Sequence, residues 1–366
     1  MFDQALILEN MEHLRQPNGA FIAAPTHDYS ALWIRDHLFM TFCYYYLGRA
    51  HDEKLIQGLQ VIFNVFHTQR HKLERIMHPR DSQGKLIIPE LIHAKYDPVT
   101  LHEVTRDWGH HQLDATGLFL YIVADLDQKN ISVLRDKGDR EILQLLVFYL
   151  HNVQYWREPD NGMWEECLIR RSSSIGAVVG GLSYIQRRGL ATVPIELITK
   201  GRNELHRILE WESRDRCAVA HHDHTCDAAQ LFLIWPFNII DRDTADLILS
   251  RIINGYHHNG AYRTLIQPFG IHRYWGDDYR RSKNDISAQW QWEFLLAIIY
   301  AQRHDYDAAR MWFQRAAGRI TEQGYITEAF TDEGPNDHTP LGWNHALALI
   351  AFSKFPRELQ EKILAQ

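Results

Sequence analysis

The chain has 366 residues, 45% of them apolar, and carries a net charge of −7 when its histidines are neutral. It contains no basic block of the kind that follows phosphates, so we do not expect a nucleic-acid partner. The longest apolar run, residues 231–240, is interrupted by Pro236 and Asn238 and is too short to cross a bilayer, so we expect no membrane partner.

Aromatic residues make up 12% of the chain, including 11 Trp and 16 Tyr, which is high for a helical protein. Rings beyond the needs of a core often line ligand sites, and the flat faces of sugars stack well on them. The four cysteines are too few for a disulfide scaffold and show no C-x-x-C spacing. The first residues lack the basic and apolar regions of a signal peptide, so we expect a cytoplasmic protein.

Helical periodicity dominates the sequence from end to end. The first periodic segment ends at the turn Pro17-Asn18-Gly19. Strand-like alternation is confined to residues 85–89 and 261–268. We expect helices near residues 6–14, 30–47, 52–77, 113–126, 140–156, 173–187, 194–212, 226–234, 243–256, 288–302, 307–321, 343–355 and 356–365.

About a dozen helices in one chain need a closed arrangement or a superhelix to bury their apolar faces. No repeat of fixed period is visible, which argues against a solenoid. No linker interrupts the chain, so we expect residues 1–366 to form a single domain. The long connections carry Trp, Asp, Arg and Glu, and loops on a rigid scaffold are where sites are found. We therefore predict a double ring of helices with the long loops at one end.

Residues 160–166, Asp-Asn-Gly-Met-Trp-Glu-Glu, are the most informative of these loops. Asn-Gly marks a tight turn, after which Trp164 stands directly before Glu165. An aromatic wall beside a carboxyl group is the setting that keeps an acid protonated for general acid catalysis. Taken alone, the segment is better explained as a surface loop whose Trp covers a helix end while its acids remain in water, and only the similar loops elsewhere in the chain favour a site.

Two earlier loops have a similar composition. In residues 29–36, Arg35 and Asp36 could bind two sugar hydroxyls as a fixed donor and acceptor, or Asp36 could simply favour a helix start. In residues 108–114, Trp108 stands before a glycine turn and is expected to wall a pocket. Capping of the following helix explains Asp114 well, and we prefer that interpretation.

A second acid comes late in the chain. Residues 270–279 are dense in aromatic and charged residues, and Glu328 follows in the segment 326–330. Two carboxylates on opposite sides of one bond are the minimum apparatus for glycoside hydrolysis. Glu165 and Glu328 are the candidates.

In this order, the segments resemble glycoside hydrolase family 15, the glucoamylase-type family, whose fold is an (α/α)6 barrel. The resemblance covers nearly the whole chain, about residues 20–355, and the ordered set is specific although each motif alone is weak. The matching stretches are Trp33-Ile34-Arg35-Asp36, Trp108-Gly109-His110-His111-Gln112-Leu113-Asp114, Trp164-Glu165-Glu166, Arg273-Tyr274, Thr327-Glu328 and Pro340-Leu341-Gly342-Trp343-Asn344-His345-Ala346.

The resemblance implies an all-α (α/α)6 barrel in which Glu165 is the general acid and Glu328 the general base. The implied reaction releases glucose with inversion from short α-glucosides or α-glucan ends and needs no cofactor. The residues implied to hold the sugar are Arg35, Asp36, Glu166 and Arg273, and those implied to line the subsite are Trp33, Trp108, Trp164 and Trp343.

Residues 31–36, 113–116, 161–165 and 172–176 also resemble the N-terminal domain of the phosphorylase kinase alpha and beta subunits, whose animal members are regulatory. A non-catalytic, carbohydrate-sensing domain that acts on a protein partner is therefore the alternative function. The presence of both glutamates favours the enzyme. His110-His111 replaces a common Arg-Pro of the fungal glucoamylases, which leaves the exact substrate open.

Residues 221–226, His-His-Asp-His-Thr-Cys, contain metal-ligand types at close spacing. The chain has 22 histidines, so such clusters arise easily by composition. The segment also stands directly before a predicted helix, where polar caps belong. We expect no metal there.

Overall fold

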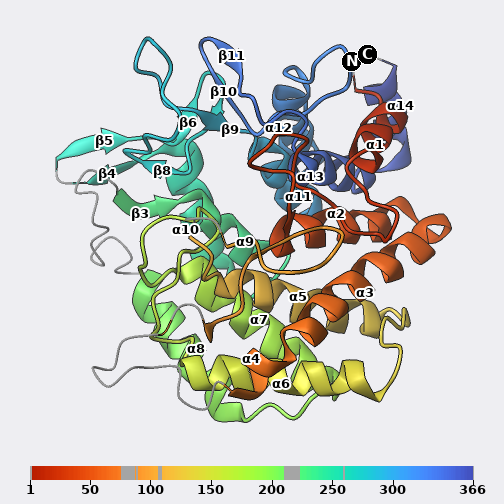
Figure 1. Cartoon of the computed structure of the whole chain (residues 1–366). Coiled ribbons are helices and arrows are strands. Elements are labelled where there is room, and N and C mark those ends of the chain that lie inside the picture. Colours follow the sequence, from red (N-terminus) through yellow and green to blue (C-terminus); the bar gives the residue numbers. More distant parts are fainter. Residues whose placement is uncertain are drawn as a thin grey trace.

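The computed structural model describes residues 2–75, 87, 90–105, 109–209, 223–258 and 260–365. Within these residues, helices form an inner ring and an outer layer around it (Figure 1). In the inner ring each helix contacts the next, and the last contacts the first. Its helices are α2 (Ile34–Leu47), α5 (Leu113–Gln128), α7 (Ser172–Arg188), α9 (Leu231–Ile234), α11 (Glu293–Gln302) and α13 (Gly342–Ser353).

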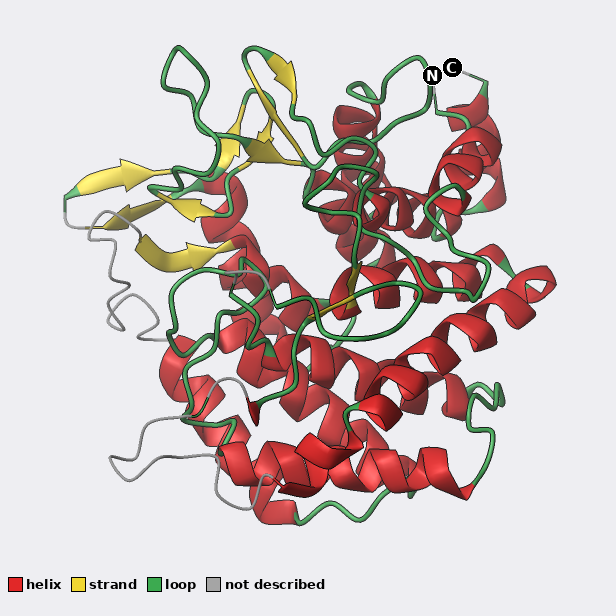
Figure 2. Ribbon diagram, viewed as in Figure 1, coloured by secondary structure: helices red, strands yellow, loops and turns green. Residues whose placement is uncertain are grey.

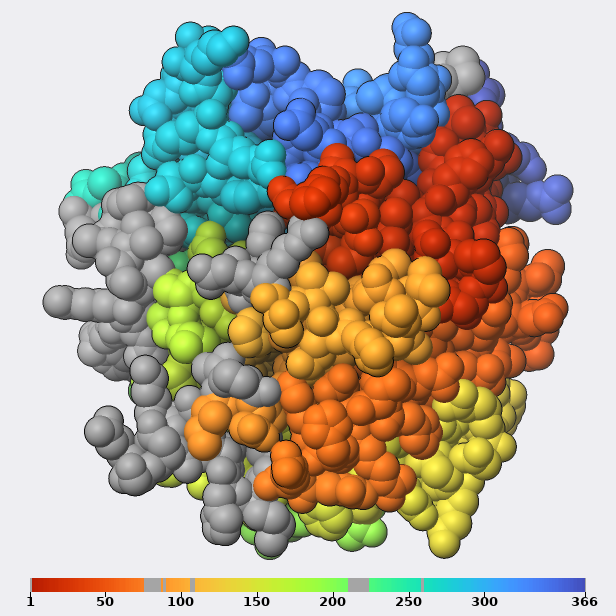
Figure 3. All heavy atoms as spheres, in the orientation of Figure 1, coloured from red at the N-terminus to blue at the C-terminus, as the bar shows by residue number. Residues whose placement is uncertain are grey.

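The outer helices pack against the inner ring one by one, which confirms the predicted double ring. α1 packs on α13, α3 on α2, α8 on α7, α10 on α9 and α12 on α11, while α6 contacts α3 and α4. The two ends of the chain therefore adjoin, as the red and blue surfaces in Figure 3 show. The remaining bounds are α1 (Gln4–Glu12), η1 (Arg49–His51), α3 (Asp52–Thr68), α4 (Arg70–Arg75), α6 (Lys137–Val153), α8 (Ile195–Leu209), η4 (Ala228–Gln230), α10 (Arg242–Asn254), α12 (Tyr306–Ala317) and α14 (Arg357–Leu364).

Burial separates the two kinds of helix. In α5 every residue from Leu113 to Leu126 is buried, as expected for a helix that is covered on all sides. In α8 the buried residues fall on one stripe, at Leu197, Ile198, Gly201, Leu205 and Ile208. The sequence thus places helices that are apolar all round inside and amphipathic helices outside.

Glycines allow the closest approach in the inner ring, between α5 and α7. A Cβ atom added to Gly117 would lie 2.4 Å from the backbone carbon of Ala177, and one added to Gly181 would lie 2.4 Å from the Gly117 oxygen. Such distances are well inside van der Waals contact. Only hydrogen at these positions lets the two helix backbones touch.

Short strands gather at one end of the barrel (Figure 2). A five-stranded antiparallel sheet has the order β11-β10-β9-β7-β6, and the pairs β1-β2, β3-β8 and β4-β5 stand apart from it. Several strands lie directly before inner helices, so they fix the loops that enter the ring. Their bounds are β1 (Leu32–Trp33), β2 (Lys95–Tyr96), β3 (Asp223–Asp227), β4 (Tyr256–His258), β5 (Ala261–Arg263), β6 (Ile266–Gln267), β7 (Gly270–Ile271), β8 (Tyr274–Trp275), β9 (Gln289–Trp290), β10 (Ala329–Thr331) and β11 (Gly334–Pro335).

Some predicted elements are wrong in their extent. Residues 226–234 end β3 and pass through a 3-10 turn before the single turn of α9, and the helix predicted from residue 288 begins only at Glu293. The reason is long-range pairing, because β9 pairs with β10, which follows some forty positions later. The strand predicted at 261–268 is two short strands. The strand predicted at 85–89 lies almost entirely outside the described residues.

Two further observations concern the chain as a whole. Cys167 is disulfide-bonded, whereas Cys43 and Cys226 are buried and form no disulfide. No helix in the described part of the chain is both long enough and apolar enough to cross a membrane.

Candidate active site

A pocket of about 210 Å³ opens among the loops that precede the inner helices. Nine of the ten predicted site residues line it, and the tenth, Trp108, lies outside the described residues. The nine are Trp33, Arg35, Asp36, Trp164, Glu165, Glu166, Arg273, Glu328 and Trp343. Tyr29, Met163, Tyr279 and Trp290 also line the pocket, and no function was predicted for them.

The 160–166 loop is fixed to the segment before α5. The Asn161 amide donates to the His111 carbonyl at 2.8 Å, and the His111 amide donates back to the Asn161 side chain at 3.0 Å. Gly162 has φ +60°, and a Cβ atom there would lie 2.2 Å from Arg171, so glycine is required at this turn. Glu165 also has φ +60°, which an acid adopts only when its surroundings hold it.

The Glu165 carboxylate accepts hydrogen bonds from two side chains. Gln112 Nε2 donates to Glu165 Oε1 at 2.9 Å, and Arg35 Nη2 approaches the same oxygen at 3.4 Å. Arg35 also donates to the Gln112 and Asp114 oxygens and to the Met163 carbonyl, so protein acceptors occupy its terminal N–H groups. Arg35 therefore orients Glu165.

The capping interpretation of Asp114 is wrong. The N-cap of α5 is Gln112, which makes no side-chain cap, and Asp114 Oδ2 accepts from Arg35 Nη1 at 3.1 Å. An acid in the first turn of a helix has the same sequence signature whether it caps or pairs. Only Arg35 in the first turn of α2, 79 residues away in the sequence, decides between the two.

Asp36 presents an acceptor to the pocket. Its side chain is buried, and it receives no hydrogen bond from another described residue. Burial raises its pKa to about 7 although Arg35 lowers it, and the charges of Glu165 and Glu328 raise it further. Asp36 thus lies within the electrostatic reach of both glutamates and can accept from a ligand hydroxyl.

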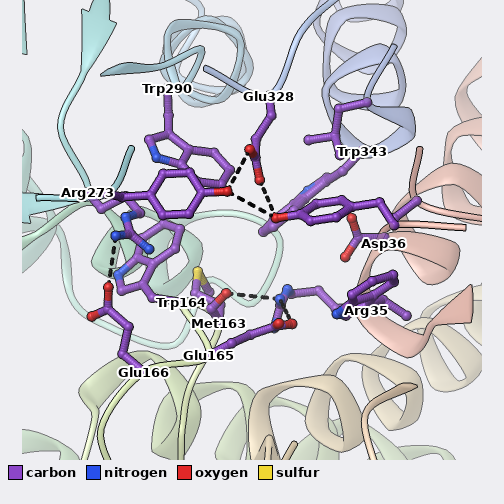
Figure 4. A pocket seen from close by; sticks show the side chains of 15 residues that line it. Arg35, Asp36, Met163, Trp164, Glu165, Glu166, Arg273, Trp290, Glu328 and Trp343 are labelled. Atoms are coloured by element: carbon purple, nitrogen blue, oxygen red, sulfur yellow. Dashed lines mark hydrogen bonds and ion pairs between the residues drawn. The ribbon is translucent and has the colours of Figure 1, made fainter. Parts of the chain in front are cut away.

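Glu328 lies directly before β10 and is fully buried at the opposite side of the pocket from Glu165 (Figure 4). Tyr29 donates to Oε1 at 2.7 Å, and Tyr279 and Asn336 donate to Oε2 at 2.9 and 2.5 Å. Burial raises the pKa of Glu328, and these hydrogen bonds oppose that rise. All three donors are neutral and point at the carboxyl group, which suits its ionised form.

A third cluster holds Glu166 at the rim. Arg273 donates to both Asp277 oxygens at 2.8 and 2.7 Å and pairs with Glu166 at 2.8 Å. Tyr274 donates to Glu166 as well, at 2.7 Å. Arg273 lies 4.8 Å from the centre of the Tyr279 ring, so its charge is also placed over an aromatic face.

Tryptophans form the apolar walls. Trp164 and Trp290 lie 6.0 Å apart between ring centres, and the Trp164 indole N–H donates to Asp227 at 2.9 Å. Trp343 stacks on Phe39 at 5.3 Å. Flat apolar walls with carboxylates between them suit a small ring that has apolar faces and hydroxyl edges.

The histidine-rich segment is only partly described. His221 and His222 lie outside the described residues, and His224 Nδ1 lies 2.8 Å from Asp227 Oδ2. Among the described residues no group of three or more His, Cys, Asp or Glu side chains is arranged to hold a metal ion.

The family model of "Glycosyl hydrolases family 15" matches residues 3–339, so the chain belongs to this family. The resemblance predicted from the ordered motifs is therefore confirmed. A glycosidase variant solved in complex with glucose has 19% identity and a TM-score of 0.74, with 97% of this chain and 99% of that chain covered. A bacterial glucoamylase complexed with acarbose has 14% identity and a TM-score of 0.66, with 97% and 56% covered. At these identities the likeness shows the fold, the predicted (α/α)6 barrel.

The phosphorylase kinase likeness is confirmed too. A Caenorhabditis elegans protein named "Probable phosphorylase b kinase regulatory subunit alpha" is 28% identical over 376 residues, which cover 87% of this chain and 30% of that protein. This chain thus spans less than a third of that relative.

Proposed function

We propose that the chain is an inverting, exo-acting α-glucosidase of the glucoamylase type that releases glucose from short α-glucosides or α-glucan ends. The observation that carries the proposal is the placement of Glu165 and Glu328 on opposite sides of one pocket (Figure 4). Membership of glycosyl hydrolases family 15 supports hydrolysis of a glycosidic bond as the reaction.

Glu165 is the proposed general acid. It gives its proton to the leaving glycosidic oxygen, and its position is set by Gln112 and Arg35. The Trp164 ring beside it keeps water from that side of the pocket.

Glu328 is the proposed general base. Its carboxylate takes a proton from a water molecule that attacks the anomeric carbon from the side opposite the leaving group. Inversion by this route needs carboxyl groups roughly 6.5–9.5 Å apart, because the water has to fit between acid and base. Tyr29 and Tyr279 hold the base in place through their hydrogen bonds to its carboxylate.

Asp36 and Glu166 are proposed to accept hydrogen bonds from sugar hydroxyls. Arg273 and the Nε group of Arg35, which has no acceptor among the described residues, are proposed as further sugar contacts, and the proposed walls are Trp33, Trp108, Trp164 and Trp343. The volume of about 210 Å³ is small beside the roughly 300–1,000 Å³ of pockets for drug-sized ligands. This size favours one terminal sugar unit over the interior of a long chain, which supports exo action.

The test is glucose release from maltose, isomaltose and trehalose at mildly acidic pH. We expect E165Q and E328Q each to lower turnover by roughly 10²–10⁴-fold while sugar binding stays measurable, since each change removes one proton transfer. The first anomer formed, followed by proton NMR, should be inverted. Wild-type-like turnover in either variant removes that residue from the mechanism, and a retained anomer excludes Glu328 as the water-activating base.

The second candidate function is a non-catalytic, carbohydrate-sensing domain. The similarity to a protein named as a kinase regulatory subunit favours it. Calorimetric binding of the same three sugars to the wild-type chain, without turnover of any of them, would support the sensor over the enzyme.

A further inference from the structure

Arg280 and His338 lie behind the two tyrosines that donate to Glu328. Arg280 Nε donates to the Tyr279 hydroxyl at 3.0 Å, and Arg280 Nη2 contacts His338 Nε2. His338 stacks on the Tyr29 ring with centres 3.7 Å apart and planes 18° from parallel. These four side chains therefore form a closed circuit around one carboxyl group.

The donor and acceptor in each hydrogen bond of Arg280 are fixed. Arginine has only donors, so His338 Nε2 must accept from it, and the His338 proton is on Nδ1, where it meets Thr26 Oγ1 at 2.9 Å. The Tyr279 oxygen likewise accepts from Arg280. Its single O–H is then free to point at Glu328 Oε2, 2.9 Å away.

Without Arg280 the direction of the Tyr279 O–H group is not fixed. The Tyr29 and Tyr279 oxygens lie 3.2 Å apart, and either of them could be the donor in that contact. A Tyr279 proton turned toward Tyr29 would leave Glu328 with one donor fewer. Arg280 adopts a left-handed φ of +47°, which is uncommon for a residue with a side chain, and its contacts with Tyr279 and His338 hold it there.

We propose that Arg280, anchored by His338, is a positioning residue that fixes Tyr279 as a donor to Glu328 and keeps that carboxyl ionised. The proposal rests on the function proposed above, in which Glu328 is the base, and deepens it. Arg280 acts through Tyr279 and has no contact of its own with the reacting atoms.

The charges around Glu328 support this assignment. Burial raises its pKa, the three hydrogen bonds lower it, and the charge of Arg280 lowers it further. The negative charge of Asp36, on α2, acts against ionisation of Glu328. The titratable and charged groups that face Glu328 are Tyr29 from the loop before β1, Tyr279 and Arg280 from the segment after β8, Asp36 from α2, and His338 from the segment after β11.

His338 is suited to be a neutral acceptor for Arg280. Burial and the charge of Arg280 lower its pKa to about 4, although Asp28 and Asp337 act in the opposite direction. Above that pH it therefore offers an unprotonated Nε2. Arg280 is exposed on its outer side, so solvent screens part of its charge and the expected effect on Glu328 is moderate.

The experiment is a carboxyl titration by NMR of protein labelled with ¹³C at the glutamate side chain, with the Glu328 signal assigned by its loss in E328Q. We expect R280Q to raise the Glu328 pKa by up to about one pH unit, since it removes a nearby cation. The matched control is R281Q, which removes the same charge from a neighbouring, exposed arginine that pairs with Asp285 at 2.8 Å. R281Q should leave the Glu328 pKa unchanged.

A Glu328 pKa that is the same in R280Q and the wild type overturns the proposal, as does an equal rise in R281Q. If R280Q does not fold, H338F replaces it, because a phenyl ring keeps the stack on Tyr29 but removes the acceptor for Arg280. We expect the Glu328 pKa to rise less in H338F than in R280Q. An unchanged Glu328 pKa in H338F overturns the proposal.

Activity gives a second readout. In R280Q the acid limb of the kcat/KM profile should move to higher pH together with the Glu328 pKa, whereas a merely structural defect lowers activity at every pH. The titration itself needs no turnover. If the wild type hydrolyses no α-glucoside but R280Q still raises the pKa, the proposed function fails and the inference about Arg280 stands.

Discussion

Glu165 and Glu328 are held by different kinds of donor. Glu165 accepts from the charged Arg35 and from Gln112, whereas the donors to Glu328 among the described residues are all neutral, and Glu328 is more deeply buried. Asp114 pairs with the same guanidinium, so the charge of Arg35 is divided between two carboxylates. The residue proposed as the base is therefore a buried carboxyl group whose ionisation is opposed by burial and supported by neutral donors.

The pH dependence follows from Glu328. Its pKa is raised above the ordinary value of 4.5, chiefly by burial. A general base must be ionised, so activity should be present above this raised pKa and should be lost as the pH falls through it. We expect the acid limb of the kcat/KM profile on the best disaccharide to lie above pH 4.5. An acid limb below 4.5 would show that another group, or an unshifted Glu328, controls it.

At the scale of elements, the contact between α5 and α7 depends on Gly117. G117A places a methyl group inside the backbone of α7, near Ala177, and forces the two inner helices apart. We expect it to lower the free energy of unfolding by about 1–3 kcal/mol, as overpacking does in a close-packed core.

Urea unfolding followed by circular dichroism measures this change. The control is G318A, at the end of α12, where a Cβ atom would lie 3.4 Å from its nearest neighbour and the φ of −63° is helical. Equal stability of G117A and G318A would show that the two inner helices separate without cost.

The helices could be predicted because each carries its own signal. An inner helix such as α5 is apolar along its length, and an outer one such as α8 has a single apolar stripe. Most strands could not, because they are two to five residues long, and several, such as β1, β3 and β9, pair with segments that are distant in the sequence. The helix predicted at residues 226–234 is longer than the one-turn helix α9. An apolar run has no period that separates helix from strand, so the sequence could not show where the helix begins.

The residues of the site also divide into those that could be predicted from the sequence and those that could not. Glu165 and Glu328 stand in motifs that are specific as an ordered set, and the structure brings both to one pocket. The functions of Tyr29 and Tyr279 depend on a carboxylate 299 and 49 residues away, and nothing near them in sequence reports it. Trp290 was hidden inside a predicted helix.

At the scale of the whole molecule, the pocket joins segments from both ends of the chain. Tyr29 and Trp33 precede α2, while Glu328 and Trp343 lie before and within α13, and these two helices pack together. A ligand that contacts both segments should hold the ring closed. That residues 1–366 form a single domain stays a prediction.

Sugar binding should therefore raise the unfolding temperature, even in a variant that does not turn over. For E165Q, a sugar at 100 times its Kd should stabilise the folded chain by about 2.7 kcal/mol. Differential scanning fluorimetry with glucose or maltose measures this, with mannitol as the control polyol. No shift at any sugar concentration would count against the pocket as a carbohydrate site.

The arrangement of the pocket also has a consequence for synthesis on the ribosome. Tyr29 is made early and its partner Glu328 almost three hundred codons later, so a growing chain carries half of the site for most of translation. A message cut short after codon 165 but before codon 328 would yield a polypeptide with Glu165 but without the opposing carboxylate. Such products should be inert as hydrolases even where their early helices have already packed.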